Sequence, residues 1–231
     1  EIVRGGGSAL FGANAVGGTI NIITKDPVSN SFQVSSMMSN MNGKSWEQYM
    51  GGNVSLVAKD NTYGIALYET YRNRNPYDAD GDGFSELGKL NMNTFGLRAY
   101  YRPSYNSRIN IEYHTTNEFR RGGNKFNLQP HETDITEQTK HIINSGGLSY
   151  DHYWNEAKHK MSLYGSIQHT DRNSYYGAQK NLKAYGKTDD LTWVLGGMYV
   201  GQMNNCLFAP ATFTGGFEYQ DNALHDVMTG Y

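Results

Sequence analysis

The chain has 231 residues, a formal net charge of −2 and a pI near 6.4, a balance that gives no indication of nucleic-acid binding. Cys206 is the only cysteine, which excludes an intrachain disulfide and a metal site built from clustered cysteines. No apolar run is long enough for a transmembrane helix, and the mean hydropathy is −0.66. Neither the length of apolar runs nor the mean hydropathy detects proteins that cross a membrane with strands, because their apolar residues occupy alternate positions. The 18 tyrosines and 27 glycines favour β-structure with aromatic girdles.

The first 26 residues, EIVRGGGSALFGANAVGGTINIITKD, concentrate glycines between short apolar pieces. Glycine tolerates positive φ and close backbone approach, so its density here indicates sharp turns and tight packing. The stretch ends in an apolar, strand-like run from Thr19 to Thr24. This composition is typical of the end of one compact unit, and a different pattern begins at Ser31.

This stretch resembles the end of the plug domain of TonB-dependent outer-membrane receptors. The matching motifs are Val3-Arg4-Gly5-Gly6, Ser8-Ala9-Leu10-Phe11-Gly12, Ala15-Val16-Gly17-Gly18 and Ile20-Asn21-Ile22-Ile23-Thr24-Lys25. Gly6 replaces a usual proline and Phe11 a usual tyrosine, and neither change requires a different fold. A generic glycine-rich βαβ loop is the alternative, but no parallel-sheet pattern follows. The resemblance implies that residues 1–26 end a plug domain, that residues 27–231 begin a transmembrane β-barrel, and that the chain is a piece of a longer protein.

From Ser31 onward, short segments alternate apolar and polar residues. The clearest example sets Phe95, Leu97, Ala99 and Tyr101 against Gly96, Arg98, Tyr100 and Arg102. A period of two with unlike faces is the pattern of a sheet between two environments. The sequence therefore predicts an all-β fold, a partial antiparallel transmembrane β-barrel of about nine strands, each of roughly ten residues.

The connections between these segments alternate in length. Short links at residues 60–61, 103–107, 155–158 and 203–210 alternate with long polar stretches at 73–91, 118–140 and 171–190. An up-and-down barrel of the outer membrane has short periplasmic turns and longer outward loops, so the long stretches are predicted to lie outside. An open sheet of nine strands would expose unpaired edges at membrane depth, so further strands must come from outside this sequence.

The first long stretch contains three alternating aspartates that are followed by a glycine, as in the first half of an EF-hand loop. The expected calcium ligands are Asp78, Asp80, Asp82, the backbone carbonyl of Phe84, and Glu86. Position twelve holds Lys89 in place of the usual bidentate glutamate. The alternative is an acidic, solvated loop tip, and the only cofactor that the sequence suggests is this Ca²⁺ ion.

The second and third long stretches supply candidate ligand-binding residues. Adjacent arginines grip carboxylates or phosphates, histidines ligate metals or haem iron, and tyrosines stack on ligands. The candidates are Arg120, Arg121, His131, His141, Tyr175 and Tyr176. Charge pairing within loops and hairpin packing are the simpler interpretations of the same residues.

Four charged residues are candidates for contact between plug and barrel. Arg98, Arg102 and Glu112 fall on the polar face of predicted strands, and Arg4 lies among the plug glycines. Their expected role is to hold the two parts together through charged hydrogen bonds.

The resemblance implies active import across the bacterial outer membrane, driven by a TonB–ExbB–ExbD complex that acts on a segment outside this chain. Residues 13–21 are closer to the siderophore, haem and cobalamin branch than to the glycan-importing branch, so a small metal chelate is the expected cargo. The other expected partners are outer-membrane lipid and a surface lipoprotein. Glycan or oligopeptide import, a passive porin or adhesin, and a soluble secreted carbohydrate-active β-protein stay open as alternatives. No catalytic triad and no acid–base carboxylate pair stands out, so the chain is not expected to be an enzyme.

Overall fold

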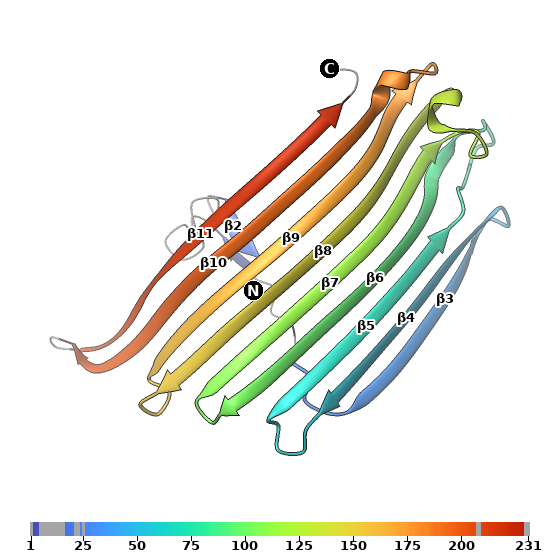
Figure 1. The fold of residues 1–231 in the computed structure, drawn as a ribbon. Coiled ribbons are helices and arrows are strands. Elements are labelled where there is room, and N and C mark those ends of the chain that lie inside the picture. The colour runs from blue at the N-terminus through green and yellow to red at the C-terminus, as the bar shows by residue number, and fades with distance from the viewer. Residues whose placement is uncertain (1, 5–16, 21–23, 25, 207–208, 229–231) are drawn as a thin grey trace.

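The computed structural model describes residues 2–4, 17–20, 24, 26–206 and 209–228, and most of them lie in strands (Figure 1). The strands are β1 (Ile2–Arg4), β2 (Gly18–Ile20), β3 (Ser31–Met41), β4 (Ser45–Val57), β5 (Tyr63–Arg74), β6 (Ser85–Ser104), β7 (Ser107–Gly123), β8 (Ile135–Trp154), β9 (His159–Ala178), β10 (Tyr185–Cys206) and β11 (Ala209–Met228). Two short 3₁₀ turns, η1 (Pro130–Glu132) and η2 (Leu182–Ala184), interrupt the loops.

Strands β3 to β11 form one antiparallel sheet in which every strand pairs with its neighbours in sequence. The pairing confirms the predicted fold, an open nine-stranded section of an up-and-down barrel. The short turns after β4, β6 and β8 lie at one end of the sheet, and the longer connections after β5, β7 and β9 lie at the other, as the alternation of link lengths predicts (Figure 1). At the loop end, Asn42 and Gly43 form the β3–β4 hairpin with φ of 51° and 73°, values that suit these two residues.

The predicted strand length and loop lengths were wrong. The nine strands span 11 to 22 residues, and β6 to β11 exceed the predicted ten by seven or more. Large parts of the three polar stretches predicted as loops are strand, and the connections shrink to residues 75–84, 124–134 and 179–184. These strand ends extend past the apolar zone, where both faces meet water and the alternation that marks a half-buried strand disappears.

One face of the sheet carries a continuous apolar band. The cross-strand register brings Ile65 beside Ala99, Ala99 beside Ile111, and Ile111 beside Leu148, and the row continues to Gly165, Leu195 and Tyr219. Several of these side chains are about half exposed, including Leu148 at 57%, which is costly in water. Toward the short turns the band ends in aromatic residues, namely Tyr63, Tyr101, Tyr150, Trp154 and Tyr199. We call this the outer face, since an apolar band edged with aromatic rings is the lipid-facing surface of a membrane barrel.

The opposite face, here called the inner face, is polar and explains part of the tyrosine and glycine content. The Tyr100 ring lies over Gly64 and the Tyr68 ring over Gly96, where an added Cβ would come within 2.5 Å and 2.2 Å of ring carbons. Glycine is therefore required at these positions because it lets an aromatic ring of the next strand lie flat on the sheet. The sequence assigned tyrosines to aromatic girdles, but Tyr68, Tyr100 and Tyr164 belong to the inner face.

In Figure 1 the small β1–β2 pair lies behind the sheet, with Ile2 opposite Ile20 and Arg4 opposite Gly18. Most of the predicted plug motif falls outside the described residues, so the boundary between residues 1–26 and 27–231 stays a prediction. No helix in the described parts of the chain is long and apolar enough to cross a membrane.

Candidate functional site

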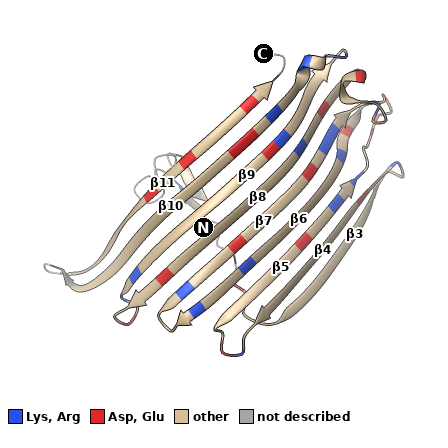
Figure 2. Ribbon diagram, viewed as in Figure 1, with Lys and Arg blue, Asp and Glu red and all other residues tan. Residues whose placement is uncertain are grey.

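Charged side chains gather toward the two ends of the strands, most densely at the loop end (Figure 2). They form three groups. Two lie on the inner face, one near the middle of the sheet and one at the loop end, and the third is the acidic loop between β5 and β6.

The middle group is organised around Asp26, the last residue of the predicted plug stretch. Its Oδ1 lies 3.2 Å from Nη2 of Arg98 on β6, and its Oδ2 lies 2.7 Å from Nη2 of Arg108 on β7. Arg98 also binds Glu112 on β7, with 2.7 Å between Nη1 and Oε1. These side chains are only 20–36% exposed, so the charges are partly desolvated and their hydrogen bonds are stronger than at an open surface. Asp26 is thus bound to two adjacent strands of the sheet.

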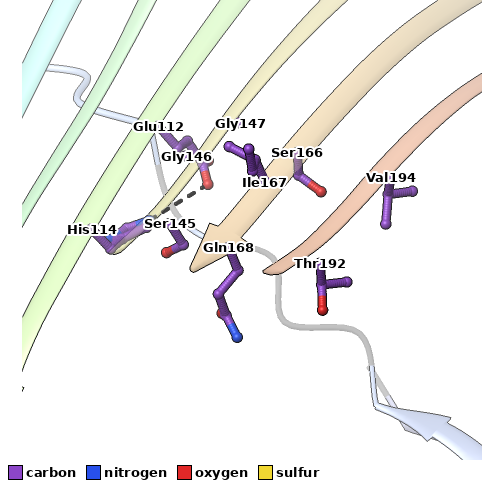
Figure 3. Close-up of a pocket in the computed structure, with 10 residues that line it drawn as sticks. All are labelled: Glu112, His114, Ser145, Gly146, Gly147, Ser166, Ile167, Gln168, Thr192 and Val194. Atoms are coloured by element: carbon purple, nitrogen blue, oxygen red, sulfur yellow. Dashed lines mark ion pairs between the residues drawn. The ribbon is translucent and has the colours of Figure 1, made fainter. Parts of the chain in front are cut away.

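This group continues across the inner face to a histidine and a tyrosine. His114 Nε2 lies 3.8 Å from Glu112 Oε2, and His114 Nδ1 lies 2.7 Å from the Tyr68 hydroxyl. Beside them is a hollow of about 350 Å³, whose walls include Glu112 and His114 from β7, Gln168 from β9 and Thr192 from β10 (Figure 3). The hollow offers a carboxylate, an imidazole, hydroxyls and an amide, a lining that suits a polar occupant.

The other two predicted contact residues lie apart from this group. Arg102 is at the short-turn end, where Nη1 donates to the Asn61 carbonyl at 3.3 Å and the guanidinium lies 5.1 Å from the Tyr100 ring centre. Arg4 is exposed in β1 and has no side-chain hydrogen bond or ion pair to another described residue.

The six predicted ligand-binding residues divide between two places. Arg120, His141 and Tyr176 belong to the inner face by register. Glu118 holds two of them, with 2.8 Å from its Oε1 to Arg120 Nε and 3.7 Å to His141 Nδ1. Tyr176 is 46% exposed. Near Arg120, a second hollow of about 370 Å³ is lined by four cations, namely Arg74, Lys89, Arg120 and Arg121, and by two carboxylates, Glu86 and Glu137.

The other three candidates build the loop cap, the packed unit formed by residues 121–136 and 175–185. Arg121 is 7% exposed, donates to the carbonyls of Lys125 and Leu128, and lies over the Phe126 ring. His131 Nδ1 lies 2.8 Å from the Tyr185 hydroxyl, and Tyr175, at 1% exposure, packs 4.7 Å from the Tyr185 ring. These contacts hold the cap together, and Arg121 binds backbone carbonyls and not the described loop carboxylates that charge pairing would use.

Asp134 is the loop-cap carboxylate whose pKa is shifted by its hydrogen-bond partners. Lys125 and Asn124 donate hydrogen bonds to Asp134 at 2.9 Å and 2.6 Å, and they hold the pKa of the Asp134 carboxyl below its ordinary value.

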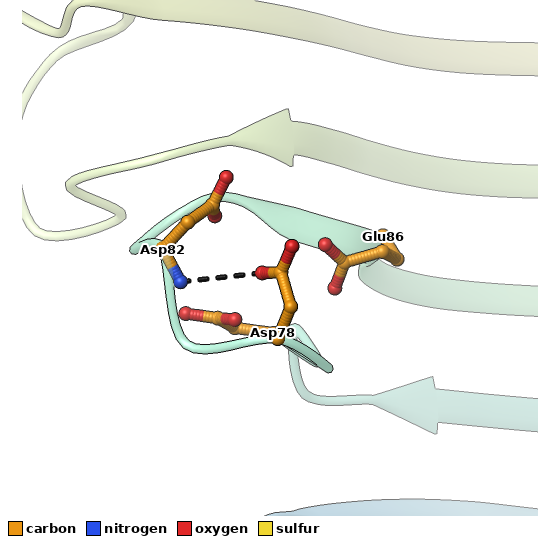
Figure 4. Close-up of side chains that lie close together, drawn as sticks. Asp78, Asp82 and Glu86 are labelled. Carbon is orange, nitrogen blue, oxygen red and sulfur yellow. Dashed lines mark hydrogen bonds between the residues drawn. The ribbon is translucent and has the colours of Figure 1, made fainter.

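The acidic loop between β5 and β6 brings its carboxylates together. One carboxylate oxygen from each of Asp78, Asp80, Asp82 and Glu86 lies within 4.8 Å of the others, and Figure 4 shows three of these side chains around the loop. The loop is shaped by its own carboxylates. Asp78 accepts from the amides of Gly81 and Gly83 at 2.6 Å and 2.9 Å, and Asp82 accepts from the Phe84 amide at 2.8 Å.

Sequence reasoning missed four inner-face residues: Asp26, Tyr68, Arg108 and His114. Arg108 and His114 are an even number of residues from Glu112 on β7, so they lie on the same face of the strand. The alternation in the sequence was therefore sufficient to find them. The approach of Asp26 to β6 and β7 is a tertiary contact over 72 and 82 residues and has no local signature.

The chain matches no protein-family model and no curated protein. Among solved structures it is similar to the siderophore receptor PirA from Acinetobacter baumannii, with a TM-score of 0.71 and 17% identity over 96% of this chain and 34% of PirA. The ferric yersiniabactin uptake receptor FyuA from Yersinia pestis (TM-score 0.46, 13% identity, 97% of this chain and 48% of FyuA) and the siderophore receptor PiuA from A. baumannii (0.44, 10%, 98% and 51%) are more distant. The chain spans 34–51% of the length of these receptors. The likeness to PirA shows the fold, and it confirms the all-β barrel section that the sequence predicts.

Proposed function

We propose that the chain is part of an outer-membrane receptor that imports a small iron chelate by TonB-dependent transport. The observation that carries this proposal is the fold, a barrel section that superposes on a siderophore receptor over 96% of this chain. The polar inner face, with hollows of about 350 and 370 Å³, supports it by offering surfaces of the size and polarity that a hydrophilic chelate requires.

The test is uptake in a strain that lacks the full-length receptor. Complementation with the intact gene should restore uptake of radioactive iron from one siderophore in a panel, and deletion of TonB should abolish that uptake. Haem and cyanocobalamin belong in the same panel, because the N-terminal motif does not separate these cargoes. Uptake that persists without TonB, or an open conductance of the purified protein in planar bilayers, would instead indicate a passive pore.

We further propose that the acidic loop binds Ca²⁺, since four carboxylates converge there and hard cations take such oxygen ligands at 2.3–2.6 Å. Binding would remove the mutual repulsion of these carboxylates and make the loop between β5 and β6 more rigid. Terbium luminescence of the full-length receptor should show one loop site that is lost in the Asp80→Asn/Asp82→Asn variant. The matched control is Asp60→Asn in a turn at the other end of the sheet. Equal luminescence in all three proteins would refute the calcium site.

A further inference from the structure

The outer face of β8, β9 and β10 has two features that lie in line along the strands. The first is a shallow apolar groove of about 380 Å³ near the middle of the apolar band. Its floor is open because Gly146 and Gly165 carry no side chain. Its walls include Leu148, Ile167 and Leu195, which are 57%, 53% and 53% exposed.

The second feature is a ladder of stacked rings nearer the short turns. His152 lies 5.7 Å from Trp154, Trp154 lies 5.6 Å from His159, and His159 lies 6.1 Å from Tyr199, with interplanar angles of 11–26°. We call these four residues the ring ladder. They come from β8, β9 and β10, the strands that also form the groove.

The ring ladder presents polar atoms at its edge. Ser107 Oγ lies 2.9 Å from His152 Nδ1, and the Tyr199 hydroxyl lies 2.7 Å from His159 Nδ1. The Nε2 atoms of both histidines and the indole N–H of Trp154 have no partner in the part of the chain that the structure describes. Lys158, in the adjoining turn, likewise has no side-chain partner there. This edge therefore combines ring donors with a cation, which is the chemistry that recognises a phosphate group.

The spacing of the two features fits one lipid molecule. Leu148 in the groove and His152 in the ring ladder are four residues apart on β8, or about 13 Å along a strand. One leaflet of a bilayer has a hydrocarbon depth of about 15 Å, half of the full core. An acyl chain lying in the groove would therefore place its headgroup beside the ring ladder.

We propose that this surface binds a single glycerophospholipid of the periplasmic leaflet, with an acyl chain in the groove and the headgroup phosphate at the ring ladder and Lys158. The periplasmic leaflet is the source because the ring ladder lies at the short-turn end of the sheet, which faces the periplasm in such barrels. The site uses the lipid-facing surface of the barrel and is separate from the inner face and its hollows.

The test is lipid retention by the full-length receptor in mild detergent, measured by native mass spectrometry during titration with phosphatidylglycerol. The wild-type receptor should retain one phospholipid. Gly165→Leu should fill the groove and weaken retention about tenfold, the effect of withdrawing about two methylene groups from apolar contact. An added Cβ there would lie 2.8 Å from the end of the flexible Leu195 side chain and at ordinary contact distance, 3.6 Å, from the Val194 carbonyl oxygen. The matched control is Gly52→Leu on the outer face of β4, where the nearest atom to an added Cβ is 3.9 Å away.

A second variant keeps the rings and removes their nitrogens. His152→Phe/His159→Phe should also lower retention about tenfold, through loss of hydrogen bonds to a charged phosphate, whereas His225→Phe on β11 should not. Unchanged retention in both test variants, equal loss in the controls, or selective retention of lipid A would overturn the proposal. Because the measurement counts bound lipid, its outcome is independent of which nutrient the receptor imports.

Discussion

The two halves of the sheet use the same strands in different surroundings. Toward the short turns, one face is apolar and the other polar, and side chains such as Leu97 and Arg98 alternate along a single strand. Toward the loops, both faces are mostly polar, with scattered apolar residues such as Leu90, and the strands are held by their backbone pairing and by the loop cap. Alternation of apolar and polar residues therefore indicates that the two faces of a strand have unlike surroundings. It does not by itself mark where the strand begins or ends.

The local stability of the loop cap should depend strongly on the buried ring of Tyr175. No single side chain should matter as much in the half of the sheet near the short turns. Tyr175→Ala would remove a ring that is 1% exposed and should cost about 3–5 kcal/mol of local stability. Tyr175→Phe should cost little, because the buried hydroxyl has no hydrogen-bond partner in the described structure. Hydrogen exchange of residues 124–136 in the full-length receptor measures both variants. Equal loss of protection in the two would mean that the hydroxyl, and not ring packing, supports the cap.

A charged substitution in the apolar band should lower the stability of the barrel. Leu148→Arg places a cation at the middle of the band and should cost about 2–4 kcal/mol of folding free energy in a bilayer. Asn144→Arg, on the same strand and face but nearer the loops, should cost about 0–1 kcal/mol. Urea unfolding of the full-length receptor in lipid vesicles gives both values. Similar costs at the two positions would remove the distinction between the two halves.

The attachment of Asp26 to the sheet should be measurable without unfolding the barrel. Asp26→Asn weakens the ion pairs to Arg98 and Arg108, and hydrogen bonds of this charged kind contribute about 1.5–3 kcal/mol each. Limited proteolysis should then cut the chain faster near residues 24–30, while Asp189→Asn on the outer face should leave that rate unchanged. If Asp26→Asn is cut no faster than wild type, Asp26 does not anchor the N-terminal stretch.

The smallest expected effect is the pH response of the loop cap. The pKa of Asp134 is lower in the folded cap than in an unfolded chain, so its contribution is present above about pH 4 and is lost as pH falls through the folded value. Exchange protection of residues 124–134 should therefore decline in acid, and Asp134→Asn should remove that decline. A pH response that survives in Asp134→Asn would assign it to another group.

Strand positions and faces could be predicted from the sequence for the half of the sheet near the short turns. They could not be predicted for the half near the loops. Phe95 to Arg102 lie where an apolar outer face meets a polar inner face, so their alternation predicts both the strand and its two faces. Residues 85–91 and 171–178 lie in strands with polar surroundings on both sides, and their composition resembles that of a loop. The convergence of the carboxylates in the acidic loop could be predicted because these residues are close together in sequence. The Asp26 ion pairs could not, because they join residues 72 and 82 positions apart.

The most direct test of the central claim is a nitroxide scan along β6 of the full-length receptor in vesicles, from Lys89 to Tyr101. The account predicts that labels at positions 95, 97, 99 and 101 collide with oxygen dissolved in lipid and that labels at 98 and 100 collide with a water-soluble nickel reagent. Labels at positions 89 to 93 should reach the water-soluble reagent on both faces. A uniform response from 95 to 101, or alternation that continues unchanged through 89 to 93, would contradict the assignment of the two halves.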